Sequence, residues 1–160
     1  MNNIFQSLIE VKGRLPKGKG ITLVGGCFDL IHVGHVHLLE HAATLDDLLV
    51  VAILSDSYAK KYKDSSRPII NQKQRARMVA SIRCVDFVYI SETSPSSVET
   101  LQTLQPNNVV FDNTAANSEK MQRRIQNMAE SSPQTKIHFL NRYNEEDIST
   151  SHIIDKIREG

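Results

Sequence analysis

Residues 24–35 (VGGCFDLIHVGH) constrain this chain more than any other stretch. They follow the apolar residues 21–24 and lead into the helix-like residues 36–43, which predicts a β-strand, a glycine turn and the start of a helix. The exposed N–H groups and the dipole of a helix N-terminus attract anions, and glycines let a phosphate approach the backbone. His32 and His35 add side-chain donors at the same place. The stretch therefore predicts a phosphate-binding site.

From Ile21 onward, apolar runs alternate with segments of helical periodicity. This pattern predicts an α/β fold, a doubly wound five-stranded parallel sheet with helices on both faces. The predicted strands are 21–25, 48–54, 86–90, 108–111 and 136–140. The predicted helices are 34–45, 56–61, 72–83, 95–104, 117–130 and 150–158. In such sheets ligands bind beyond the carboxyl ends of the strands, so the turn after the first strand is expected at the functional edge.

The length of 160 residues suits a single domain. Residues 1–18 are predicted to form an N-terminal helix and a linker, because the apolar positions of residues 2–12 share one helical face and a stretch rich in glycine and lysine follows. A docked helix and a homodimer contact are both compatible with this segment. The sequence does not separate them.

The composition argues against several classes of protein. The formal net charge is +1, so no overall field favours a nucleic acid partner. No apolar run approaches the roughly 20 residues that span a bilayer, and no signal segment is recognisable, so we expect a cytoplasmic protein without a membrane partner. Cys27 and Cys84 do not suggest a disulfide framework. The chain contains neither a P-loop motif nor a dinucleotide-binding glycine motif.

Residues 26–35, here called the signature segment, resemble the G-[TC]-F-D-x-x-H-x-G-H signature of the cytidylyltransferase-like nucleotidyltransferases and match it at every fixed position. The resemblance implies a Rossmann-like fold and one nucleotidyltransferase domain over residues 1–160. It also implies that the segment binds a nucleoside triphosphate through Gly26, Cys27, Phe28, His32, Gly34 and His35. His32 and His35 would be the catalytic donors to the phosphates.

Ser149, Thr150 and Ser151 resemble the family's I-S-T-[ST] helix start, which is a second nucleotide contact. Hydroxyl residues before an apolar-periodic run are also ordinary helix N-caps. Capping needs one hydroxyl and this segment offers three, so we expect the others to contact phosphate.

The loop after the second predicted strand carries clustered cations. Lysines in a loop are commonly just solvated. The family resemblance makes Lys60, Lys63, Arg67 and Arg75 candidates for binding the acceptor's phosphate. Lys63 is also a candidate for a catalytic role.

The resemblance implies that a phosphate oxygen of the acceptor attacks the α-phosphorus of ATP or CTP and releases pyrophosphate. The protein then positions and neutralises the phosphates, with Mg²⁺ bridging them and no metal bound by a dedicated set of side chains. The partners are a nucleoside triphosphate and a sugar or polyol phosphate. Gly26–Asp29 and residues 55–68 are most similar to heptose-1-phosphate adenylyltransferases, whereas residues 81–86 are more similar to glycerol-3-phosphate cytidylyltransferases.

Two alternatives of other classes remain open at this stage. Residues 111–115 depart from the glycine-rich turn of many relatives, so a nucleotide-binding module without turnover is one alternative. Acidic residues at 145–147 stand where relatives that act on glycerol phosphate have an arginine and a glycine, so the resemblance does not identify the acceptor. His37, Glu40 and His41 match H-x-x-E-H, the inverted zincin pattern, so a zinc peptidase is another. That pattern has few fixed positions, and a zincin needs a further ligand.

Overall fold

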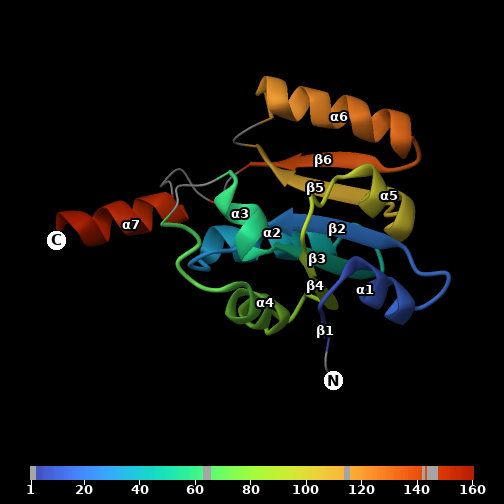
Figure 1. The fold of residues 1–160 in the computed structure, drawn as a ribbon. Coiled ribbons are helices and arrows are strands. Elements are labelled where there is room, and N and C mark those ends of the chain that lie inside the picture. Colours follow the sequence, from blue (N-terminus) through green and yellow to red (C-terminus); the bar gives the residue numbers. More distant parts are fainter. Residues whose placement is uncertain (1–2, 63–65, 114–115, 142, 144–147) are drawn as a thin grey trace.

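A computed structural model of the chain describes residues 3–62, 66–113, 116–141, 143 and 148–160. One six-stranded sheet with the order β1-β4-β3-β2-β5-β6 forms its centre, and every neighbouring pair is parallel (Figure 1). The strands are β1 (Ile4–Phe5), β2 (Ile21–Gly26), β3 (Leu48–Leu54), β4 (Phe87–Ser91), β5 (Asn108–Asp112) and β6 (Lys136–Leu140). The helices are α1 (Leu8–Arg14), α2 (Val33–Ala43), α3 (Asp56–Lys60), α4 (Gln72–Ala80), α5 (Val98–Leu104), α6 (Glu119–Ser131) and α7 (Thr150–Glu159). The predicted parallel α/β fold is confirmed.

The predicted number of five strands is wrong, because β1 adds a sixth strand at the edge of the sheet. Ile4 lies opposite Val88 of β4, and the Val88 N–H donates to the Asn3 carbonyl at 2.9 Å. Ile4 and Phe5 pack into the cores on opposite faces of the sheet, which is the two-residue alternation of a strand. The predicted helix over residues 2–12 therefore begins only at α1.

Helices cover both faces of the sheet, as expected for a doubly wound fold. On one face, side chains of α2 and α4 pack with Leu49, Val51 and Ile53 of β3. On the other face, α1, α5 and α6 pack with Val50 and Ala52 of the same strand. The alternation along β3 thus builds two cores. None of the described helices is long and apolar enough to cross a membrane.

The strand order reverses at β2, which places the signature segment at the functional edge of the sheet. The chain adds β3 and then β4 on one side of β2, and β5 and then β6 on the other. The carboxyl ends of β2 and β5 therefore flank the topological switch point, where ligands of open α/β sheets bind.

Candidate active site

The loop between β2 and α2 holds an unusual backbone conformation. Phe28 and Leu30 have φ values of 52° and 49°, in the left-handed region that non-glycine residues seldom occupy. Such conformations persist only where the surroundings hold them, and they cluster at functional sites. The Phe28 ring is 4% exposed and lies in the core with Leu39 of α2, which anchors the loop. The loop is thus a preformed feature of the fold.

Two glycines of the signature segment make room for its rings. A Cβ on Gly34 would lie 3.0 Å from two atoms of the His32 ring. A Cβ on Gly26 would lie 2.9 Å from the Phe28 ring. Gly34 was expected to take part in triphosphate binding, and the structure shows that the space beside it is occupied by the His32 ring.

The two signature histidines form a stacked pair at the start of α2. Their ring centroids are 3.9 Å apart, with 30° between the planes. His32 is the N-cap residue of α2, and its backbone N–H donates to Nδ1 of His35 at 3.4 Å. In the neutral ring an accepting Nδ1 leaves the proton on Nε2. His35 can therefore offer an Nε2–H donor to a ligand.

A cavity of about 420 Å³ lies at the switch point, between α2, the ends of β5 and β6, and the start of α7. We call it the α2–α7 cavity. Its lining includes His32, Gly34, His35, His37, Leu38, Arg67, Asp112, Leu140, Asn141, Tyr143, Ile148, Ser149, Thr150 and Ser151. The structure thus brings the two predicted nucleotide-binding segments, far apart in the sequence, to one cavity.

The three hydroxyl residues of the α7 start have three different partners. Ser149 is the N-cap, and its hydroxyl accepts from the His152 N–H at 3.1 Å. The Thr150 hydroxyl donates to the Asp29 carbonyl at 2.6 Å and is buried. The Ser151 hydroxyl accepts from Nη1 of Arg67 at 3.2 Å. Beside any ligand contact, this segment fastens α7 to the signature segment and to the loop that carries Arg67.

Asp29 is a signature residue whose role could not be read from the motif alone. Its side chain is 1% exposed, and its two oxygens accept from the backbone N–H groups of Ile69 and Ile70 at 2.9 and 3.0 Å. Arg67 Nε lies 3.8 Å from the same carboxylate. Asp29 therefore holds the loop of residues 67–70 against the signature segment. Its fixed place in the signature was the signal that could have found this role.

Arg67 lines the cavity that also contains the predicted nucleotide-binding residues. The sequence placed it among the acceptor-binding cations, yet it lines the α2–α7 cavity together with His32 and Ser151. Its guanidinium is held by Asp29 and Ser151, so its charge is fixed in place beside the histidine pair.

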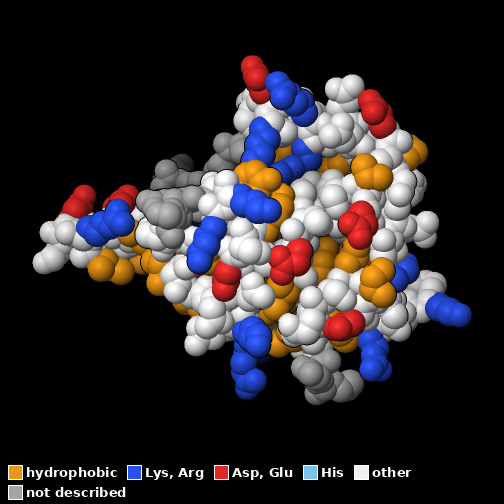
Figure 2. All heavy atoms as spheres, viewed as in Figure 1, with side chains coloured by type: hydrophobic (Ala, Val, Ile, Leu, Met, Phe, Trp, Pro, Cys, Tyr) orange, Lys and Arg blue, Asp and Glu red, His pale blue; other side chains and the backbone are white. Residues whose placement is uncertain are grey.

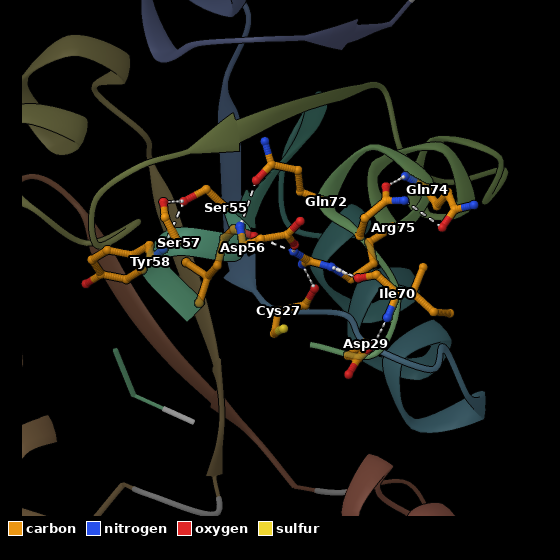
Figure 3. A network of polar contacts seen from close by, with 12 residues as sticks. Cys27, Asp29, Ser55, Asp56, Ser57, Tyr58, Ile70, Gln72, Gln74 and Arg75 are labelled. Carbon is orange, nitrogen blue, oxygen red and sulfur yellow. Dashed lines mark hydrogen bonds and ion pairs between the residues drawn. The ribbon is translucent and has the colours of Figure 1, made fainter. Parts of the chain in front are cut away.

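Arg75 has a structural position instead of the expected acceptor contact. Its guanidinium is 1% exposed and donates from Nε to the Ile70 carbonyl at 2.8 Å, and from Nη1 to the Cys27 carbonyl (Figure 3). Nη2 donates to the Leu54 carbonyl at 2.8 Å and to Asp56 Oδ1 at 2.7 Å. These bonds fasten α4 to the ends of β2 and β3. A buried guanidinium with these partners does not support direct contact with the acceptor.

Of the remaining predicted site residues, Lys60 is the one that the structure describes. Lys60 is exposed in the last turn of α3, just past the end of β3. Lys63 lies outside the described residues, as do residues 114–115 and 144–147 of the two divergent segments.

Asp112 belongs to the divergent segment of residues 111–115 and had no predicted role in the site. It is the last residue of β5, is exposed and lines the α2–α7 cavity. An acid directly after a buried strand next to β2 was the available signal, because parallel strands end at the same edge of the sheet.

His37 belongs to the α2–α7 cavity and not to a zincin-like centre. Its ring lies 5.1 Å from the Tyr143 ring, and both residues line the cavity. Within the described part of the chain, no group of three or more His, Cys, Asp and Glu side chains is arranged to hold a metal ion. The geometry therefore gives no support to the zinc peptidase alternative.

Comparisons with known proteins identify the family of the chain. The model of the family described as cytidylyltransferase-like matches residues 23–156. Bifunctional protein HldE of Geotalea uraniireducens (strain Rf4) is 44% identical over 97 residues, which are 60% of this chain and 19% of that protein. Bifunctional protein HldE of Helicobacter pylori (strain HPAG1) is 37% identical over 138 residues, which are 86% of this chain and 27% of that protein. The chain thus spans less than a third of these relatives' length.

Solved structures share the fold at lower identity. A lipopolysaccharide core biosynthesis protein from Thermoplasma volcanium has a TM-score of 0.66 at 21% identity, and the match covers 79% of this chain and all of that one. A pantothenate synthetase from Thermus thermophilus has a TM-score of 0.67 at 13% identity, and the match covers 94% of this chain and 67% of that one. At these identities the likeness concerns the fold alone.

Proposed function

The chain belongs to the cytidylyltransferase-like family of nucleotidyltransferases, and from this premise we propose that it transfers AMP from ATP to the phosphate of a sugar phosphate, releasing pyrophosphate. The observation that carries the proposal is the convergence on one cavity of the stacked His32–His35 pair, Arg67 and the hydroxyl residues of α7. These groups are the donors that a triphosphate needs.

We place the triphosphate at the N-terminus of α2. The helix dipole and the exposed N–H groups of the first turn favour an anion there. His32, His35 and Arg67 surround this point, and Ser151 lies beside Arg67. The nucleoside then lies toward the less polar part of the cavity, formed by side chains that include Leu38, Leu140, Tyr143 and Ile148.

In the proposed reaction an oxygen of the acceptor's phosphate forms a bond to the α-phosphorus of ATP. The bond from the α-phosphorus to the bridging oxygen breaks, and its electron pair leaves with pyrophosphate. No protein atom has to act as a nucleophile, so the protein contributes positioning and stabilisation of the charge that grows on the phosphate oxygens. His32, His35 and Arg67 are the donors for that charge.

The donor set of the α2–α7 cavity fits a Mg²⁺ ion that travels with the triphosphate. Mg²⁺ is held in such sites by one or two carboxylates together with phosphate oxygens and waters. Asp112 lies at the cavity and can supply a carboxylate, whereas the Asp29 carboxylate is buried in backbone hydrogen bonds. A bound Mg²⁺ would neutralise phosphate charge.

Adenine is preferred over cytosine, and a heptose 1-phosphate is the preferred acceptor. The support comes from the resemblance of Gly26–Asp29 and residues 55–68 to heptose-1-phosphate adenylyltransferases. Residues 81–86, which resemble the cytidylyl branch, precede β4 at the amino edge of the sheet, where Asp86 accepts from the Leu49 N–H at 2.8 Å. That segment lies at the edge opposite the ends of β2 and β5, so it carries little weight for the choice of base.

The test is pyrophosphate release from ATP and from CTP, each with Mg²⁺ and a panel of sugar and polyol phosphates. We expect turnover with ATP and a heptose 1-phosphate to exceed all other pairs. Turnover confined to CTP and glycerol 3-phosphate would replace this proposal by the cytidylyl alternative. Tight ATP binding without turnover on any acceptor would identify a binding module.

A further inference from the structure

A groove lies beside α7, the helix that projects from the body of the molecule. Its volume is about 550 Å³, and we call it the α7 groove. Its apolar lining consists of Leu30 of the signature segment, Ile69 of the loop before α4, and Ile154 and Ile157 of α7. Ile69 and Ile157 are 55% and 72% exposed. Two large apolar side chains of the same groove therefore face solvent.

The apolar side of α7 is poorly covered by the rest of the chain. Ile153, Ile154 and Ile157 share this side, and none of them belongs to either core of the described residues. Figure 2 shows hydrophobic side chains along the lower side of α7 and charged side chains along its upper side. A helix of ten residues is marginal by itself, because most helical stability in proteins comes from the packing of an apolar face. A second molecule that covers this face would supply that packing.

Two opposite charges stand beside the apolar residues of the groove. Asp155 and Arg158 both line it and are exposed. Among the residues that the structure describes, neither of them has an ion-pair partner. A second copy of the same helix, running antiparallel, can pair both. The surface is therefore complementary in charge to an identical surface.

One two-fold axis across α7 allows the apolar and the charged pairings together. In a two-fold interface, residue i of one copy contacts residue j of the other, and j contacts i. Antiparallel α7 helices would place Ile154 against Ile157 of the second copy, and Asp155 against its Arg158. The midpoints of these two pairings differ by one residue of the sequence, a shift of about 1.5 Å along a helix. A single axis therefore serves both pairings.

We propose that the α7 groove is a contact between two copies of this chain, with their α7 helices antiparallel. A polyanion or an anionic membrane fits this surface less well, because such partners attract a helix with an excess of positive charge. The four acidic and basic side chains of α7 cancel, since Asp155 and Glu159 stand beside Lys156 and Arg158.

The α7 groove adjoins the α2–α7 cavity, so the contact between copies bears on nucleotide binding. Arg67 and Ser151 line both spaces, and Nη1 of Arg67 donates to the Ser151 hydroxyl at 3.2 Å. A second copy along α7 stabilises the helix whose start carries Ser151. The dimer then binds ATP more tightly than the monomer. This coupling rests on the proposed function, because it takes the triphosphate to lie in the α2–α7 cavity.

Charge reversal tests the contact by sedimentation velocity over a range of protein concentrations. We expect the wild type to dimerise, and Asp155→Arg or Arg158→Asp to raise the dimer Kd at least about tenfold, because each change sets like charges opposite each other at two places. An equimolar mixture of the two variants should recover a dimer, since opposite charges then face each other again. Lys156→Glu, which reverses an exposed charge of α7 outside the groove lining, is the control and should dimerise like the wild type.

Three results would overturn the contact. They are a wild type that stays monomeric at every concentration, a dimer that both reversals leave unchanged, and a mixture that stays monomeric. The second result would place the contact elsewhere, for which residues 1–18 are the candidate. Because both reversed side chains are exposed, we expect the circular dichroism of the variants to match that of the wild type.

Calorimetry with a non-hydrolysable ATP analogue tests the coupling. We expect each monomeric variant to bind the analogue at least about fivefold more weakly than the wild type, and the mixture to recover the affinity. Equal affinity of monomer and dimer would overturn the coupling. Absence of binding to the wild type would count against the proposed function, whereas sedimentation decides the contact independently of any nucleotide.

Discussion

At the scale of single residues, the stacked histidines are the groups whose loss should affect chemistry most. His32→Ala or His35→Ala removes a donor that stabilises charge in the transition state, which typically lowers the rate about 10²- to 10³-fold. We expect kcat to fall by this amount with a smaller change in ATP affinity. His152→Ala, which alters an exposed histidine of α7, is the matched control. Full turnover in both signature variants would show that the pair is structural.

Thr150 has a structural role that can be separated from ligand binding. Its buried hydroxyl donates to the Asp29 carbonyl at 2.6 Å, so Thr150→Val keeps the shape and leaves that carbonyl without its donor. An unsatisfied buried group costs about 1–3 kcal/mol, and we expect the free energy of unfolding to fall by this amount in denaturant titrations. Thr150→Ser keeps the hydroxyl and should remain close to wild type. Equal stability of the Val variant would mean that this hydrogen bond contributes nothing.

At the scale of elements, Arg75 joins three pieces of secondary structure. Its guanidinium reaches the carbonyls of Cys27 after β2, Leu54 of β3 and Ile70 before α4, together with Asp56. Arg75→Met removes the donor of three backbone carbonyls and of the partly exposed Asp56 carboxylate, and one unsatisfied buried group typically costs about 1–3 kcal/mol. We expect the free energy of unfolding, measured by chemical denaturation, to fall by at least this amount. Arg77→Met, which changes an exposed arginine of the same helix, is the control and should remain close to wild type.

Arg75→Lys should not restore the stability, because an ammonium group lacks the planar fork that serves several acceptors at fixed positions. A lysine variant with wild-type stability would contradict the view that geometry, and not charge alone, makes this residue important.

The elements also show which features a sequence can predict. The strands β2 to β6 are fixed by local apolar runs, so they lie within about two residues of their predicted bounds. The two-residue strand β1 could not be predicted, because the spacing of Ile4, Phe5, Leu8 and Ile9 also suits a helix. Its strand conformation depends on pairing with β4. Ile9, expected on one helical face with Ile4, Phe5 and Leu8, is 68% exposed.

The same limit applies to the candidate site. The importance of His32, His35 and residues 149–151 for the α2–α7 cavity was predictable, because these residues lie in two compact motifs. The roles of Asp29 and Arg75 were not predictable, because each depends on hydrogen bonds to backbone groups distant in the sequence. Arg67 was recognised as a functional candidate, but its place beside the histidines results from the fold that Asp29 imposes on its loop.

At the scale of the whole molecule, three distant segments are linked around the α2–α7 cavity. The Asp29 carboxylate accepts hydrogen bonds from the backbone of residues 69 and 70, and the Asp29 backbone carbonyl accepts one from Thr150 of α7. Arg67 connects the second segment to the third through Ser151. Figure 1 shows that α7 extends away from the sheet, so its start provides the link to the body of the molecule. A ligand at the cavity should therefore stabilise all three segments together.

Hydrogen exchange measured by mass spectrometry tests this coupling. A ligand that binds only the folded cavity makes local opening less favourable, which slows exchange of the amides that the opening exposes. With a saturating non-hydrolysable ATP analogue, we expect slower exchange in peptides covering residues 26–35, 66–71 and 149–156, whereas α1, on the opposite face of the sheet, keeps its rate. Thr150→Val should weaken protection in the α7 peptide more than in the signature segment, because it removes the hydrogen bond that joins them. Protection confined to residues 26–35 in the wild type would show that ligand binding at the signature segment does not stabilise the other two segments.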